Sequence, residues 1–305
     1  MSTPSVENAV LDPYNADPDK IPNTDRYRRE PLYGRYRPKP DDFQPDPKHF
    51  MSTTAESLKY WESVLALCDA SIRIYENPDD GRDVFALGGV IVKSSHLNPL
   101  YSQTQLDGTY VDANEVQAID LVRGALGDVR VPTIYFAGKI NGLPVLVQER
   151  ISGVVLAVAW QYLSQTQKAS FKQQAREILR QMQQLQPPAS CTARRYIVPD
   201  PDPVKHRGIS ELENDILFSD KNKDIDLSFM HNDFNQGNTV VDNNRIVGLF
   251  DWEMAGYFGR KTAAKVHTKC RGAHRRAYVT LGLPEEKVND LMFWQDLYEI
   301  NETEV

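Results

Sequence analysis

The chain has 305 residues, of which 41% are hydrophobic and 25% are charged, and its formal net charge at pH 7 is −7. These fractions exclude a collagen-like, coiled-coil or wholly disordered chain, and the acidic balance argues against a nucleic-acid binder. The longest apolar run, Val154–Trp160, is too short to cross a membrane, and the three cysteines are unlike a disulfide framework. Because no secretory signal is visible either, we expect a cytoplasmic protein that binds neither nucleic acid nor a membrane.

Residues 1–50 form a proline-rich extension. They contain nine of the 19 prolines, a density that prevents long helices. Two interpretations are open: a disordered tail, or an extended arm that packs over the folded body. The second is favoured by the number of aromatic residues, which is high for a solvated tail. These residues are Tyr14, Tyr27, Tyr33, Tyr36, Phe43 and Phe50.

Helical and strand patterns alternate between residues 51 and 148. Thr53 and Glu56 have capping-box spacing at the start of a helix whose apolar face ends at Cys68. The turn dipeptides Gly88-Gly89 and Asn141-Gly142 separate short runs of strand-forming residues. The further predicted elements are a hairpin over Asp83–Lys93, a helix over Asp112–Arg123, and strands over Val131–Phe136 and Leu143–Gln148.

The rest of the chain is mainly helical. A helix with an apolar stripe begins near Ser164 and is terminated by Pro187-Pro188, and helical patterns return after Gly259. Between them, Leu227–Trp252 is strand-like, with its sharpest turn at residues 242–244. We therefore divide the chain into the extension (1–50), a small mixed lobe (51–147), and a hinge followed by a larger, mainly helical lobe (148–305).

Two polar loops interrupt the strand-like segment. The first carries Asp233 and Asn238, and the second carries Asp251. In a hairpin that turns near residue 243, Asn238 and Asp251 come side by side, within reach of one hard cation that prefers oxygen ligands. Asp233 then faces the same pocket as a carboxylate not committed to metal. Each residue alone could serve only to build a turn, but together they suit phosphoryl transfer.

These loops resemble those of the aminoglycoside phosphotransferase/choline kinase family. HNDFNQGN at residues 231–238 looks like the family's HGDxxxxN catalytic loop, and FDWEMAG at residues 250–256 looks like its IDWExAG metal loop. The likeness covers roughly residues 80–260 and includes FALGGVIVK, NEVQAIDLVR and VLVQERISG. The resemblance implies an α+β, bilobal, protein-kinase-like fold, with a small antiparallel-sheet N-lobe and a larger, mainly helical C-lobe.

The resemblance also implies a kinase that uses ATP and Mg²⁺ to phosphorylate a hydroxyl group of a small-molecule acceptor. Asp233 would be the catalytic base or orient the acceptor hydroxyl, and His231 would support its loop. The family's remaining roles fall on two sets of residues in this sequence. Magnesium would be held by Asn238 and Asp251. The nucleotide would be bound by Lys93 with its partner Glu115, by a loop at Gly88 and Gly89, and by backbone groups near Gln148, Glu149, Arg150 and Ile151.

Several alternatives stay open from the residues themselves. Asp112 and Glu115 have capping-box spacing, so Glu115 could cap its helix instead of pairing with Lys93. Lys93 could be an edge lysine that only prevents aggregation. Asn232 stands where the family has glycine, which leaves a catalytically inactive pseudokinase as the alternative function. The acceptor could be an antibiotic, a choline-like amine, a sugar or a secondary metabolite.

The segment Arg260–Arg276 carries seven Lys/Arg and the trio His267, Cys270 and His274. The trio lies at i, i+3 and i+7, a spacing that would place it on one helical face and could suggest zinc, although only three ligands are offered. The basic residues are interpreted as a solvated helix face or, alternatively, as a site for an anion or a phosphorylated substrate.

Overall fold

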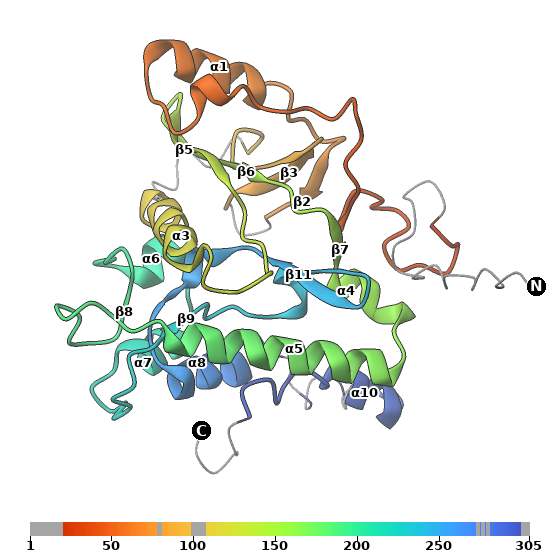
Figure 1. The fold of residues 1–305 in the computed structure, drawn as a ribbon, viewed down its shortest axis with the longest axis vertical. Helices are drawn as coiled ribbons and strands as arrows, with labels where there is room; N and C mark the ends of the chain where they lie inside the picture. Colours follow the sequence, from red (N-terminus) through yellow and green to blue (C-terminus); the bar gives the residue numbers. More distant parts are fainter. Residues whose placement is uncertain are drawn as a thin grey trace, which may run out of the picture.

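A five-stranded antiparallel sheet forms the upper lobe of the protein (Figure 1). The computed structural model describes residues 21–77, 81–98, 108–272, 275, 278 and 281–299. The strand order is β2-β3-β4-β6-β5, and both predicted turn dipeptides join neighbouring strands. The bounds are β2 Arg73–Tyr75, β3 Asp83–Leu87, β4 Val90–Ser94, β5 Ile134–Ile140 and β6 Leu143–Glu149.

Two helices accompany this sheet. The helix α1 (Ala55–Leu65) buries Trp61, which stacks on Phe136 of β5. Its N-cap is Thr54, whose hydroxyl accepts a hydrogen bond from the Ser57 N–H, so the cap lies one residue after the predicted Thr53. The helix α3 (Thr109–Val122) lies between the sheet and the lower lobe (Figure 1).

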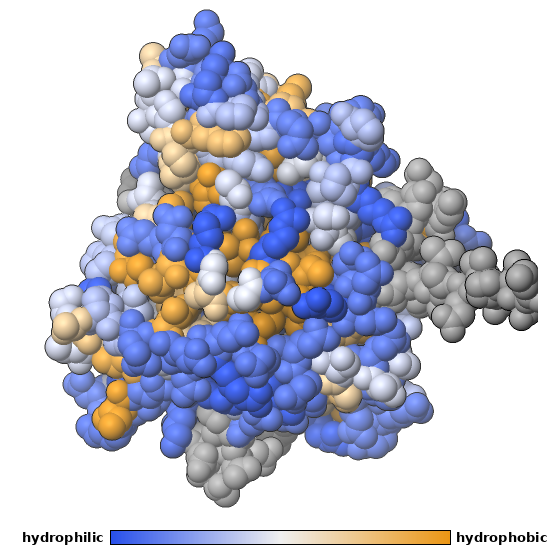
Figure 2. Space-filling view, viewed as in Figure 1, coloured by the Kyte–Doolittle hydropathy of each residue, from blue (hydrophilic) through white to orange (hydrophobic). Residues whose placement is uncertain are grey.

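The lower lobe is organised around the 20-residue helix α5 (Gln165–Gln184), which begins with a Ser164 capping box as predicted. One face of α5 is buried along Phe171, Ala175, Ile178, Leu179 and Met182. The opposite face is hydrophilic, whereas hydrophobic residues gather above it, where the two lobes meet (Figure 2). The other helices are α4 Leu156–Ala159, α6 Pro203–Arg207, α7 Glu211–Phe218, α8 Arg260–Val266 and α10 Glu285–Leu291.

Short strands complete the lower lobe. They form a sheet of order β1-β7-β10-β11 and a second sheet of order β8-β12-β9. Asn243 and Asn244 adopt positive φ angles in the turn between β10 and β11, as that predicted turn requires. The two-lobed α+β arrangement confirms the predicted fold class. The bounds are β1 Arg35–Tyr36, β7 Gly153–Val155, β8 Arg195–Tyr196, β9 Phe229–Met230, β10 Thr239–Asp242, β11 Arg245–Leu249 and β12 Gly256–Tyr257.

The described part of the N-terminal extension packs against the body. Arg35 in β1 forms a buried ion pair with Asp25 at 2.5 Å, and β1 pairs with β7 of the lower lobe. Farther along the chain, the Phe43 carbonyl accepts a hydrogen bond from Gly89 of the upper lobe. From residue 21 to residue 50 the extension is therefore an arm, whereas Tyr14 lies outside the described residues. The segment boundaries at residues 50 and 147 stay predictions.

No helix in the described ranges is both long and apolar enough to span a membrane.

Candidate active site

A cleft of about 630 Å³ is lined by residues of both lobes. Lys93 of β4 and the hinge residues Gln148–Ile151 line it from the upper side. Asp233, Asn238 and Asp251 line it from the lower side, so these predicted residues from distant parts of the sequence share one cavity with Lys93, whereas Glu115 lies behind the lining.

Lys93 lies at the centre of an ion-pair cluster. Its Nζ is 2.8 Å from Glu115 Oε2 and 2.5 Å from Asp251 Oδ1, and its side chain is 9% exposed. Burial alone disfavours the ammonium, but Asp251 and Glu115 outweigh it and raise the pKa of Lys93 above its usual range. The lysine is therefore charged and held inside the cleft, and the edge-lysine interpretation is wrong.

Glu115 lies too far into α3 to cap it. The helix begins at Thr109 with Gly108 as its N-cap, and Asp112 in the first turn pairs with Arg82. Glu115 is consequently on the second turn, fully buried, and directed at Lys93. The capping alternative is therefore wrong.

The catalytic-type loop holds its carboxylate with two side-chain amides. Asp233 Oδ1 accepts a hydrogen bond from Asn235 Nδ2 at 2.9 Å, and Asp233 Oδ2 accepts one from Asn238 Nδ2, also at 2.9 Å. Asn235 in turn caps the short 3₁₀ turn Gln236–Asn238, because its Oδ1 accepts bonds from the N–H groups of Gly237 and Asn238. Burial raises the pKa of Asp233 to about 7, although Arg271 opposes the shift.

His231 joins the two polar loops. Its Nε2 lies 3.0 Å from the carbonyl oxygen of Phe250, and its Nδ1 lies 3.3 Å from the Asp233 N–H. With Nε2 protonated, the neutral ring donates to the first group and accepts from the second. Burial lowers the pKa of His231 to about 4, so the ring is neutral at pH 7. This position, away from the cavity lining, agrees with the predicted supporting role.

Asn232 has φ 62°, in the left-handed region that favours glycine. Asparagine is one of the non-glycine residues that adopt this region most readily, so it can replace the family's glycine without changing the shape of the loop.

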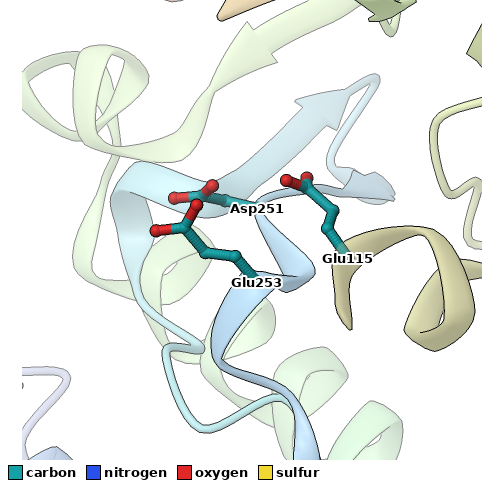
Figure 3. Close-up of side chains that lie close together, drawn as sticks. All are labelled: Glu115, Asp251 and Glu253. Carbon is teal, nitrogen blue, oxygen red and sulfur yellow. The ribbon is translucent and has the colours of Figure 1, made fainter. Parts of the chain in front are cut away.

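Three carboxylates from two elements converge beside Lys93. Glu115 comes from α3, whereas Asp251 and Glu253 follow β11 (Figure 3). One carboxylate oxygen from each lies within 4.8 Å of the others, an arrangement that could hold a metal ion. Glu253 Oε2 is also 3.6 Å from Arg82. Sequence reasoning did not assign Glu253 a role, although its place two residues after Asp251 was the available signal.

The donor set suits magnesium. Asp251, Glu253 and Asn238 all line the cleft and offer the hard oxygen atoms that magnesium prefers. Asn238 donates through Nδ2 to Asp233, so Oδ1 is the atom that it would offer to a metal ion.

Gly88 and Gly89 do not reach the cleft. A Cβ on Gly88 would lie 2.4 Å from the backbone nitrogen of Phe43, because the N-terminal arm covers this turn. The cavity is lined instead by Asn77, Gly81 and Arg82, from the connection between β2 and β3. The prediction that Gly88 and Gly89 lie in the nucleotide site therefore disagrees with the lining of the cleft.

The hinge is fastened to the N-terminal arm. The Arg150 guanidinium donates to the carbonyl oxygens of Leu32 at 2.8 Å and Arg35 at 2.9 Å, and it lies over the Tyr36 ring. The arm thereby contributes Leu32–Tyr36 to the lining of the cleft, a contribution that the sequence did not reveal. Gln148–Ile151 line the same region, and their contact with adenine stays a prediction.

The proposed zinc trio is not assembled in the described residues. His267 is buried, with Nε2 3.0 Å from the Trp294 carbonyl oxygen, and His274 lies outside the described residues. The segment is a π-helical turn, His267–Arg271, in place of the regular helix that the spacing assumed.

The comparison with known protein families agrees with the motifs of the two polar loops. The model of a family described as the phosphotransferase enzyme family matches residues 113–258, which include Glu115, the hinge and both polar loops. This match confirms the resemblance indicated by the loops and, with the observed two lobes, the protein-kinase-like fold class. No curated protein sequence matches the chain.

Several solved structures are similar to the chain. One is the ternary complex of aminoglycoside phosphotransferase APH(2″)-IIa with streptomycin and ATP, at 12% identity and a TM-score of 0.45, covering 81% of this chain and 83% of that one. Another is the GDP complex of aminoglycoside 2′-phosphotransferase-IIIa, at 16% identity and a TM-score of 0.44, covering 81% and 85%. A third is amicoumacin kinase hAmiN with AMP-PNP, Ca²⁺ and Ami, at 15% identity and a TM-score of 0.42, covering 82% and 81%.

Proposed function

Because residues 113–258 carry the sequence pattern of the phosphotransferase enzyme family, we propose that this protein transfers the γ-phosphate of ATP to a hydroxyl group of a small molecule. One observation carries the proposal. The amide-bound carboxylate of Asp233 lines the same cleft as Lys93, whose ammonium is paired with Glu115 and Asp251. A proton acceptor and a buried cation in one cavity are what phosphoryl transfer requires.

Asp233 acts on the acceptor. The bonds from Asn235 and Asn238 fix its carboxylate, so that it orients the acceptor hydroxyl and receives its proton. As the acceptor oxygen bonds to the γ-phosphorus, the bond from this phosphorus to the β–γ bridging oxygen breaks and ADP leaves. Its pKa of about 7 suits both the uptake and the release of a proton near neutral pH.

Lys93 acts on the nucleotide. The ammonium group exchanges part of its contact with Asp251 for the α and β phosphates, while Glu115 keeps it in place. Asn238, Asp251 and Glu253 would hold magnesium, which when bound neutralises phosphate oxygens. Adenine would lie against the hinge at Gln148–Ile151, and the lining residues Asn77, Gly81 and Arg82 would lie near the phosphates.

The test is the Asp233→Asn variant, measured with ATP, Mg²⁺ and a small-metabolite extract. The amide keeps the shape of the carboxylate but cannot accept the proton, so transfer falls by about 10³-fold or more while nucleotide binding persists. Gln236→Ala, on the same loop, is the matched control that retains activity. Transfer by Asp233→Asn at the wild-type rate contradicts the role of Asp233. A wild-type protein without Mg²⁺-dependent ATP binding contradicts the function as a whole.

A further inference from the structure

Arg271 places a guanidinium group beside Asp233, and no step described above uses it. It is the last residue of the π-helical turn that follows α8, and Gly272 ends this turn. A Cβ at Gly272 would lie 2.6 Å from the His267 carbonyl oxygen, so a larger residue would not fit this sharp ending. The turn thus brings Arg271 into the lining of the cleft.

The Arg271 guanidinium is held in place, but not all of its hydrogen-bond donors are used. Its Nη2 donates to the buried Glu213 at 2.7 Å, which anchors the side chain from below. Its Nη1 is 3.6 Å from Asp233 Oδ1, which is longer than a hydrogen bond. Its Nε is buried and has no hydrogen-bond partner within the part of the chain that the structure describes. Because Nε is buried and Nη2 is bound to Glu213, Nη1 is the nitrogen that keeps its donors for a further anionic group.

Arg271 and Asn238 approach different oxygens of the Asp233 carboxylate. Asp233 Oδ2 is bound by Asn238, a residue of the magnesium set, whereas Asp233 Oδ1 is directed at Asn235 and Arg271. Because the acceptor hydroxyl must approach the γ-phosphate with Asp233 beside it, Arg271 is next to the acceptor and not to the adenosine.

A second element adds basic groups to the same cavity. Lys205 and His206 of α6 line the cleft, and the His206 ring is stacked on Tyr110 with 5.0 Å between ring centroids. Two acids that contact these groups are already paired. Asp200 is paired with His206 at 2.8 Å, and Glu213 is paired with Arg271. The acceptor end of the cleft thus presents basic side chains.

From this arrangement we infer that the acceptor is a hydroxyl compound carrying an anionic group, a carboxylate or a phosphate, which Arg271 binds. This inference rests on the proposed function and narrows its substrate class. A guanidinium matches the planar oxygen pair of a carboxylate or phosphate with two parallel hydrogen bonds. A polycationic acceptor would instead meet Arg271 and Lys205 as like charges.

The first test measures binding of inorganic sulfate, an anion without a hydroxyl, by calorimetry on the full chain loaded with Mg²⁺ and a nonhydrolysable ATP analogue. Sulfate should bind the wild type and the control Lys269→Gln, an exposed basic residue of the same turn. Arg271→Gln should weaken binding by about 10–100-fold, and Arg271→Lys should recover part of it. The double variant Arg271→Gln/Glu213→Gln, which leaves no buried unpaired carboxylate, serves if the single variant does not fold.

Equal sulfate affinity in the wild type and in the folded Arg271→Gln or double variant overturns the inference. So does the absence of sulfate binding to a wild type that binds the nucleotide. If the wild type does not bind the nucleotide with Mg²⁺, the proposed function fails, and the inference fails with it.

The second test identifies the acceptor class directly. A metabolite extract is separated on an anion exchanger before the reaction, and each fraction is incubated with the protein and γ-labelled ATP. Label transferred to compounds of the retained, anionic fraction supports the inference, and the Arg271→Gln variant should raise the KM for that acceptor by at least about 10-fold. Label only in the unretained fraction overturns the inference while the proposed function stands.

Discussion

Asp251 and Asp233 line the same cleft, yet their surroundings differ in kind. Asp251 contacts the Lys93 ammonium at 2.5 Å, and this pairing keeps the pKa of Asp251 below its usual value despite burial. Asp233 is held by neutral amides and has its nearest cation, Arg271, at 3.6 Å, so burial prevails and its pKa rises to about 7. The surroundings of the two aspartates therefore set different pKa values: Asp251 stays ionised and suits a metal ligand, whereas Asp233 suits a proton acceptor.

Replacing each aspartate by asparagine gives the largest expected effect. Both Asp233→Asn and Asp251→Asn should reduce transfer by about 10³-fold, because each removes a charge used in the transition state. Titration with Mg²⁺ separates them, since only Asp251→Asn should raise the magnesium concentration needed for nucleotide binding. The same magnesium dependence in both variants would contradict the division of roles.

Replacing Lys93, the cation that keeps Asp251 ionised, should give the next largest effect. Lys93→Met leaves Glu115 buried without its partner, and a broken buried pair costs about 3–5 kcal/mol of unfolding free energy. Urea unfolding measures this loss. In the matched double variant Lys93→Met/Glu115→Leu, much of the stability should return, because no carboxylate then lacks a partner at the position of Glu115. A double variant as unstable as Lys93→Met would contradict this account.

His231 connects the loops of the two aspartates, and its effect depends on pH. Its folded pKa of about 4 lies below the unfolded value, so the unfolded chain binds the proton first as the pH falls. The stability supplied by the neutral ring is complete above about pH 6.5 and is lost progressively toward pH 4, a loss of about 3 kcal/mol. In His231→Gln, which keeps a donor for the Phe250 carbonyl, this loss should be missing. Unfolding free energies measured from pH 7 to pH 4 should show the contrast, and parallel curves would refute it.

The smallest expected effect concerns the amides around Asp233. Asn235→Ala removes the cap of the 3₁₀ turn and one of the two bonds to the carboxylate, at a cost of about 1 kcal/mol of stability. Turnover should fall by several fold, because the carboxylate is less well oriented. Gln236→Ala on the same loop should change neither quantity, and an equal loss in both variants would contradict the assigned role of Asn235.

The sequence predicted the site where its residues lie on short, strongly patterned segments. Asp233, Asn238 and Asp251 occupy loops beside strands, so their spacing predicted a shared pocket, and the family resemblance added Lys93 at the end of a strand run; all four line one cleft. The prediction failed where the geometry depends on packing between distant segments. Gly88 and Gly89 form the expected turn, but the arm at Phe43 covers this turn. No pattern in the sequence around Gly88 predicts that contact.

Two further features could not be predicted from the sequence, because they depend on where a helical element begins and on its type. Arg271 reaches Asp233 through a π-helical turn, whereas the periodicity assumed a regular helix. Asp112 and Glu115 matched a capping motif, but the helix begins earlier, at Thr109. The spacing of Asp112 and Glu115 fits a capping motif, but the residue at which the helix begins decides whether Glu115 can reach the helix N-terminus.

The arm gives the two lobes a covalent connection beside the hinge. Its strand β1 is paired with β7 below the cleft, and the Phe43 carbonyl accepts a hydrogen bond from Gly89 above it, so the chain passes here from the lower to the upper lobe (Figure 1). Because Arg150 of the hinge is bound to the arm, the arm limits how far the two lobes can separate on that side of the cleft. A single cut in the peptide chain between residues 37 and 41 would remove this covalent link and leave the hinge and the pairing of Arg130 with β11 to hold the lobes together.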